Sequence, residues 1–265
     1  MSGLSRWNPL QFTRAGKVFS SLVGVASIVG TLVALGVIAP VDENALEAAA
    51  DKTSEAGSSR VYLKRTIVDG STTREEEATG ELDYRTEAGW LVYVSGPATG
   101  LRILIRKPFV YELGISSESV WCTYDLRTAG SSLFGVATGF SADPAAALVN
   151  LKESGTYERI GEEDLPGRRA VHYQGSVDLA TLQQRELDPH LAKQIGEFAR
   201  SQGLSTFEVD VWVGEDELVS RLKLTYESIA TLDWTFSHYG TQVAEEVPPS
   251  DELAAPGERG CPVEP

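Results

Sequence analysis

The feature that most constrains the fold is an alternation of apolar and polar residues that recurs along most of the chain. In residues 207–213, apolar side chains occupy every second position, and Glu208 and Asp210 lie between them. A period of two is typical of a strand with one buried and one exposed face. Similar segments follow one another at short intervals: 60–68, 72–84, 90–94, 101–106, 109–113, 120–126, 157–165, 169–177, 221–226 and 232–236. Their spacing predicts a meandering antiparallel sheet of nine to eleven strands, which is long enough to curl.

Three segments are predicted to be helical. Residues 42–57 are rich in alanine and end at Gly57, as helices often do. Asp143 followed by Pro144 is typical of a helix start, and apolar spacing indicates a further helical segment within about 179–203. We therefore expect an α+β fold in which the helices cover the concave apolar face of the curled sheet.

A long uncharged stretch lies near the N-terminus. Residues 18–41 run for 24 positions without a charged side chain, and about 20 apolar residues span a bilayer core as a helix. Arg6, Arg14 and Lys17 precede the stretch, and acidic residues follow it from Asp42 onward. The positive-inside rule then predicts a single-pass membrane anchor with the remainder of the chain outside the cytoplasm.

The expected organisation has four parts. Residues 1–17 form a cytoplasmic segment, 18–41 a transmembrane signal anchor, 42–247 the β-rich domain, and 248–265 a proline- and glutamate-rich tail without a core. A cleaved signal peptide is the alternative, because residues 34–36 could serve as a weak cleavage site. Either alternative places the β-rich domain outside the cytoplasm.

Charge and cysteine content agree with export. The formal net charge is −15, and it becomes more negative once the three N-terminal basic residues are set aside. Such a charge argues against nucleic acid as a partner. The two cysteines, Cys122 and Cys261, both fall in the exported part and are expected to form a disulfide, with two independent thiols as the alternative.

Signals of catalysis are weak. The three histidines, His172, His190 and His238, belong to no metal-binding or nucleophile motif. The acidic runs 75–77 and 162–164 are interpreted as solvated faces of strands or turns. We therefore expect no enzyme, no metal and no cofactor.

The apolar faces of the strands are the more informative candidate site. They are either a dry core beneath the helices or the wall of a pocket for an acyl chain, and periodicity alone leaves both open. The candidate lining residues, including two from a glycine-rich apolar segment expected to act as a mobile rim, are Leu63, Ile103, Ile105, Leu133, Phe134, Val209, Val211, Leu222, Leu224, Trp234 and Phe236.

Several segments together resemble a known family. They are residues 143–148, the run 161–167, the strand 210–213, and 236–240 with the prolines that follow. In order and spacing they resemble the LppX/LprG-type envelope lipoproteins of actinobacteria, which share the LolA-like fold. The resemblance implies a half-open antiparallel β-barrel with helices in its mouth and a hydrophobic cavity, in a family that carries lipids, lipoglycans or lipoproteins.

One departure from that family concerns the anchor. Residues 35–41 contain no cysteine, whereas the family lipoproteins carry a lipidated cysteine directly after the apolar segment. The N-terminal helix is therefore expected to tether the protein. The leading hypothesis is a membrane-tethered extracytoplasmic protein that binds or transfers an acylated lipid or lipoglycan. The alternative is an envelope interaction or sensor protein, with a protein partner and a barrel filled by its own side chains.

Overall fold

A computed structural model describes residues 43–69, 71–114, 120–125, 143–154, 156–185, 193, 196–197, 199–200, 203–244, 247–259 and 261. All of them belong to one compact unit, Pro40–Pro265. The expected anchor, residues 18–41, lies outside the described residues. Within the described residues, no helix has the length and apolarity required to span a membrane.

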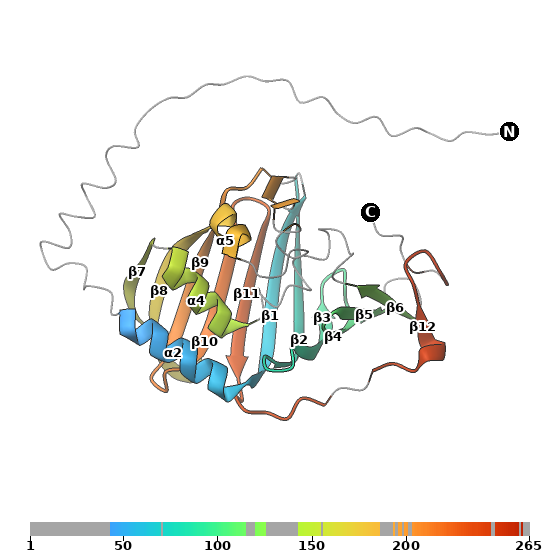
Figure 1. Cartoon of the computed structure of the whole chain (residues 1–265), viewed down its shortest axis with the longest axis horizontal. Coiled ribbons are helices and arrows are strands. Elements are labelled where there is room, and N and C mark those ends of the chain that lie inside the picture. The colour runs from blue at the N-terminus through green and yellow to red at the C-terminus, as the bar shows by residue number, and fades with distance from the viewer. Residues whose placement is uncertain are drawn as a thin grey trace, which may run out of the picture. The chain divides into compact units, whose positions relative to one another are not determined.

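Strands dominate the described part of the chain (Figure 1). Their bounds are β1 Ser58–Asp69, β2 Thr72–Asp83, β3 Ala88–Ser95, β4 Arg102–Arg106, β5 Phe109–Leu113, β6 Trp121–Asp125, β7 Thr156–Leu165, β8 Arg168–Asp178, β9 Thr206–Gly214, β10 Val219–Tyr226, β11 Ala230–Ser237 and β12 Leu253–Ala254. They form one open sheet in the order β12-β6-β5-β4-β3-β2-β1-β11-β10-β9-β8-β7. Within β1–β6 and within β7–β11, strands adjacent in the chain pair antiparallel, as the alternation predicts.

Two pairings depart from the simple meander. β1 pairs with β11, with Val61 opposite Phe236, and so joins the meander β1–β6 to the meander β7–β11. β12 pairs with β6 in parallel, with Ala254 opposite Cys122. The segment expected to be a tail without a core thus contributes a strand to the edge of the sheet.

The described helices are α2 Glu43–Ala56, α4 Pro144–Ser154 and α5 Leu179–Arg185. The expected start of α4 is confirmed, because Oδ1 of Asp143 accepts hydrogen bonds from the amides of Ala145 and Ala146. The expected end of α2 is confirmed as well, since Gly57 follows it at φ +73°.

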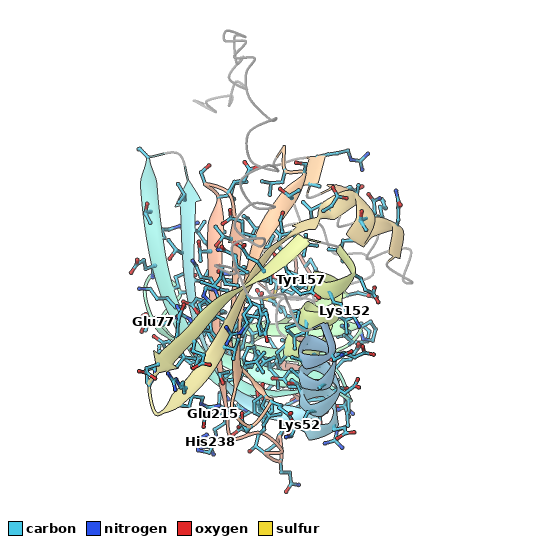
Figure 2. All side chains as sticks on the ribbon, turned by 90° about the vertical axis from the view of Figure 1, so that its left-hand side faces the viewer. Lys52, Glu77, Lys152, Tyr157, Glu215 and His238 are labelled. Carbon is cyan, nitrogen blue, oxygen red and sulfur yellow. A yellow bond between two sulfur atoms is a disulfide. The ribbon has the colours of Figure 1, made fainter. Side chains whose placement is uncertain are left out.

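All three helices pack on one face of the sheet. They contact one another and strands β7, β8 and β10 (Figure 1). Lys152 of α4 donates a 2.6 Å hydrogen bond to Glu47 of α2, and Figure 2 shows Lys52 and Lys152 on the side of the molecule away from Glu77. The face under the helices is called the inner face below, and the opposite face the outer face.

One large core cluster joins the helices to the inner face. Leu46 of α2 and Leu148 of α4 belong to the same cluster as side chains from β1 to β5 and β8 to β11. The alternation explains this division. In β10, Leu222, Leu224 and Tyr226 are buried, and the residues between them are partly exposed. The fold is therefore a large, mostly antiparallel open sheet with few helices on one face.

Candidate functional site

The predicted lining residues lie together on the inner face. One row of registered partners crosses the sheet: Tyr93, Ala78, Leu63, Trp234, Leu222 and Val211. A parallel row contains Ile103, Leu91, Gly80, Val61 and Phe236. All the predicted residues except Leu133 and Phe134 belong to the single core cluster. Those two lie outside the described residues.

These side chains are deeply buried. Leu222, Leu224 and Val211 are 0% exposed, and even the most exposed of the predicted set, Ile105, reaches only 9%. The inner face is thus a continuous apolar surface over most of the sheet's width. The prediction that it lines a ligand pocket stays a prediction.

A polar group within this face was missed at the sequence level. Arg65 of β1 and Glu76 of β2 are directly opposite in register, and their side chains are 17% and 5% exposed. Nε and Nη2 of Arg65 both donate to Oε2 of Glu76, the Nε bond at 2.9 Å. The guanidinium also lies over the ring of Tyr93, 5.2 Å from its centroid.

Glu112 of β5 completes the group, which we call the inner polar cluster: Arg65, Glu76, Tyr93 and Glu112. Glu112 is 7% exposed and lies opposite Ile103, so it belongs to the inner face. Burial raises the pKa of its carboxyl, and the charge of Arg65 opposes that rise. Burial also raises the pKa of the Tyr93 hydroxyl. Arg65 lowers it, and Glu76 and Glu112 add to the rise.

The alternation of side chains between the two faces of β2 is the signal that could have predicted this cluster. The run 75–77 was interpreted as a solvated face, yet Glu76 shares its parity with Ala78 and Leu82, which are buried. Alternation therefore assigns Glu76 to the inner face and its neighbours to the outer face. A buried carboxylate needs a cation, and Arg65 is the residue that stands opposite it.

The outer face carries a second polar group across β7 to β10. Nδ1 of His172 lies 2.7 Å from Glu163, and its Nε2 lies 2.9 Å from Asp210. The imidazole stacks on Trp212 with ring centroids 4.2 Å apart, and Arg221 lies over the same indole, 4.5 Å from its centroid. His172, expected to belong to no site, is thus held by two carboxylates and a ring.

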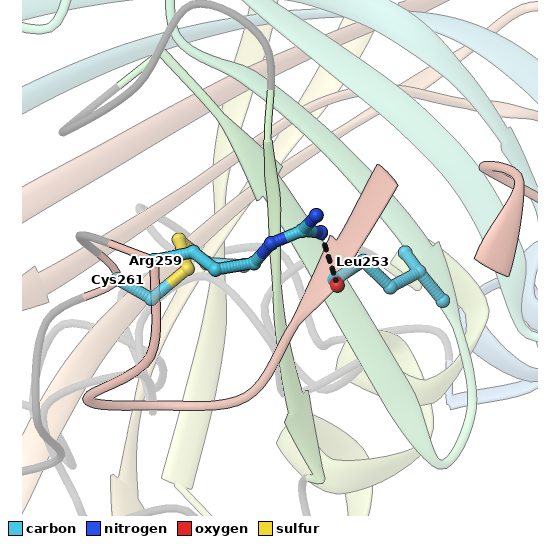
Figure 3. Close-up of a disulfide and its surroundings, with 4 residues drawn as sticks. Leu253, Arg259 and Cys261 are labelled. Carbon is cyan, nitrogen blue, oxygen red and sulfur yellow. Dashed lines mark hydrogen bonds between the residues drawn. A yellow bond between two sulfur atoms is a disulfide. The ribbon is translucent and has the colours of Figure 1, made fainter. Parts of the chain in front are cut away.

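The expected disulfide is confirmed at the edge of the sheet. Cys122 and Cys261 are bonded, with their Cα atoms 5.4 Å apart. Nη1 of Arg259 donates to the carbonyl of Leu253 at 3.2 Å, which holds the turn before Cys261 against β12 (Figure 3). An open cavity of about 450 Å³ at this edge is lined by residues that include Phe109, Thr123 and Pro256. None of the predicted lining residues contributes to that cavity.

Comparisons with known proteins give distant relatives. No family model matches the chain. An uncharacterized 31.2 kDa protein of Streptomyces griseus, from the rplA–rplJ intergenic region, is 30% identical over 117 residues, which are 42% of this chain and 38% of that protein. The match therefore spans well under half of the relative's length.

Solved structures with similar folds include LppX, LprF and a LolA superfamily protein. Lipoprotein LppX of Mycobacterium tuberculosis is 13% identical with a TM-score of 0.49, covering 77% of this chain and 99% of LppX. LprF of Mycobacterium bovis is 14% identical with a TM-score of 0.45, covering 78% and 96%. A LolA superfamily protein of Nitrosomonas europaea is 13% identical with a TM-score of 0.35, covering 76% and 93%.

Proposed function

We propose that this protein is a membrane-tethered, extracytoplasmic binding protein that holds the acyl chain of a lipid or lipoglycan against the inner face of its sheet. The observation that carries the proposal is the continuity of that face. Inward-facing side chains stand in register from β3 to β9, so one apolar strip crosses six neighbouring strands.

The geometry of the strip suits an extended apolar ligand. Strands lie about 4.8 Å apart, so six strands provide a strip of about 25 Å, comparable with a long acyl chain. Apolar contact along such a length is favourable, at about 0.8 kcal/mol for each methylene group removed from water. Binding rather than catalysis is proposed, because an apolar strip supplies contact area and no reactive group.

Tethering is proposed from the sequence. The uncharged residues 18–41 are long enough to span a bilayer, and the charge changes sign across them. Protease added to intact spheroplasts is expected to digest the β-rich domain and leave a small membrane-bound fragment. Full-length chain in the soluble fraction would contradict the anchor, and a protected domain would contradict the orientation.

A second function is favoured by one observation. The inner-face side chains are almost completely buried, with Trp234 at 2% and Phe236 at 1% exposed, as expected of a face filled by the protein's own side chains. In that case the protein would act through a protein partner in the envelope.

Lipid analysis separates the two functions. The full-length chain is purified from membranes, delipidated by solvent extraction, and the extract is analysed by mass spectrometry. Acyl lipid in a fixed molar ratio to protein, above that of an unrelated single-pass protein purified identically, is expected. A ratio equal to that of the control would contradict the binding proposal and leave the partner function.

A further inference from the structure

The inner polar cluster lies beside the apolar strip, because Arg65 and Glu76 stand two residues along β1 and β2 from Leu63 and Ala78. Arg65 and Glu76 are opposite each other in register, and Tyr93 lies opposite Ala78, two positions further along β2 from Glu76. Three adjacent strands therefore place these side chains side by side, and Glu112 reaches the same face from β5.

Within this cluster, Arg65 and Glu76 satisfy each other, and the hydroxyl of Tyr93 is left without a partner. Arg65 and Glu76 form a hydrogen-bonded ion pair. Tyr93 is 1% exposed, and its hydroxyl has no hydrogen-bond partner in the part of the chain that the structure describes. Glu112 is 7% exposed, and Arg65 is the cation that acts on its carboxyl.

A buried hydroxyl without a partner is costly, at about 1–3 kcal/mol. Tyr93 and Glu112 lie on the same face of the sheet, on β3 and β5, with β4 between them, and Glu112 stands in the row of Leu91, two residues from Tyr93. A group placed between them would have to accept a proton from Tyr93 and donate one to Glu112. A hydroxyl does both.

Other head groups fit less well. A phosphate or carboxylate accepts from Tyr93 but is repelled by Glu112, and Arg65 is already neutralised by Glu76. An ammonium donates to Glu112 but has no lone pair for the Tyr93 proton. An ester without a free hydroxyl satisfies Tyr93 alone.

We propose that Tyr93 and Glu112 form a hydroxyl-binding subsite, which holds the head of a neutral, hydroxyl-bearing lipid such as a monoacylglycerol while its chain follows the apolar strip. This inference rests on the proposed function, since it names the class of ligand for the same face. Arg65 and Glu76 position the subsite: the guanidinium covers the Tyr93 ring and, with Glu76, leaves no net charge to attract an anion.

The test is a competition among four probes with the same oleyl-length chain. The full-length chain in detergent micelles is equilibrated with equal amounts of 1-monooleoylglycerol, methyl oleate, oleylamine and oleic acid. Protein-bound lipid is then separated by size exclusion and counted by mass spectrometry. Monooleoylglycerol is expected to exceed each of the others by about fivefold or more, the ratio that one well-formed hydrogen bond provides.

Two conservative variants locate the effect. Tyr93→Phe and Glu112→Gln are each expected to reduce the preference for monooleoylglycerol over methyl oleate by about fivefold, with methyl oleate binding unchanged. Thr225→Val is the matched control, because it also removes a buried hydroxyl that has no partner in the described structure, but on the outer face. The control is expected to keep the wild-type preference.

The outcomes separate the two proposals. Equal binding of monooleoylglycerol and methyl oleate would overturn the hydroxyl subsite and leave acyl-chain binding intact. A preference for oleylamine or oleic acid would overturn it in favour of a charged head group. Binding of none of the four probes would contradict the proposed function itself. A preference that survives both variants would place the hydroxyl elsewhere and overturn the assignment to Tyr93 and Glu112.

Discussion

The indole Nε1 of Trp212 donates a 2.8 Å hydrogen bond to Oε2 of Glu163, across the intervening strand β8. This bond is the largest cause that holds the pKa of Glu163 below its usual value near 4.5, and His172 adds to the effect. A carboxyl whose pKa is lowered by folding stabilises the protein above the unfolded pKa, and that stabilisation is lost as pH falls through the folded pKa.

Glu163→Gln is therefore expected to lower the urea midpoint at pH 7 and to have little effect in acid below the folded pKa of Glu163. The check is a series of urea unfolding curves from about pH 3 to pH 8. Glu215→Gln, at an exposed position in the β9–β10 turn, is the matched control and should change nothing. A Glu163 effect independent of pH would show that the carboxylate charge plays no part.

Glu75 and Glu76 are consecutive, yet substituting them is expected to lower the free energy of unfolding by very different amounts. Glu76→Gln leaves the mostly buried Arg65 guanidinium without its anion, which is expected to cost about 3 kcal/mol of unfolding free energy. Glu75 pairs with Lys64 on the outer face, where both side chains are well exposed, so Glu75→Gln should cost less than about 1 kcal/mol. Equal costs, measured by urea unfolding, would refute the assignment of the two carboxylates to opposite faces.

The disulfide should stabilise the edge of the sheet. It closes a loop with a sequence separation of 139 residues, for which chain entropy gives about 4–5 kcal/mol. Cys261→Ser is expected to speed amide hydrogen exchange in β6 and β12, while exchange in β9 and β10 stays slow. Reductant added to the wild type should reproduce the pattern. Unchanged protection of β12 would mean that strand pairing alone holds it.

Leu224→Trp distinguishes a packed inner face from one with ligand space. In a packed core the larger tryptophan side chain is expected to lower the free energy of unfolding by about 1–3 kcal/mol, because Leu224 is 0% exposed. In a pocket the ring should occupy ligand space, so that bound lipid falls and the melting temperature changes little. Thr225→Trp, one residue away on the outer face, is the control for bulk alone. Strong destabilisation, with no lipid on the wild type, would exclude the binding function.

Local pattern predicted most of the strands and the start of α4, because alternation and capping act within a few residues. It did not predict the pairing of β1 with β11, since partners so distant in sequence leave no local signal. β12 was missed for a different reason. Leu253 and Ala254 are too few to show a period, and they pair with β6, which is far away in the sequence.

For the candidate site, alternation identified the inner apolar residues because burial follows the strand period. The inner polar cluster was missed because Glu76 stands within an acidic run whose neighbours are solvated. The pairing of Arg65 with Glu76 depends on the register of β1 against β2, in which Asp69 stands opposite Thr72. Whether the face holds a ligand depends on packing between distant elements, which no period encodes.

The position of β1 between β2 and β11 has a consequence for biosynthesis. The chain is synthesised from its N-terminus, so β1 and β2 can pair early. The other edge of β1 pairs only with β11, the last long strand to be made. Until then that edge offers free backbone groups to any neighbouring chain. The pairing of β1 with β11 joins segments that are far apart in the sequence, and such pairings form slowly. Nearly the whole domain must therefore be synthesised before β1 can pair with β11.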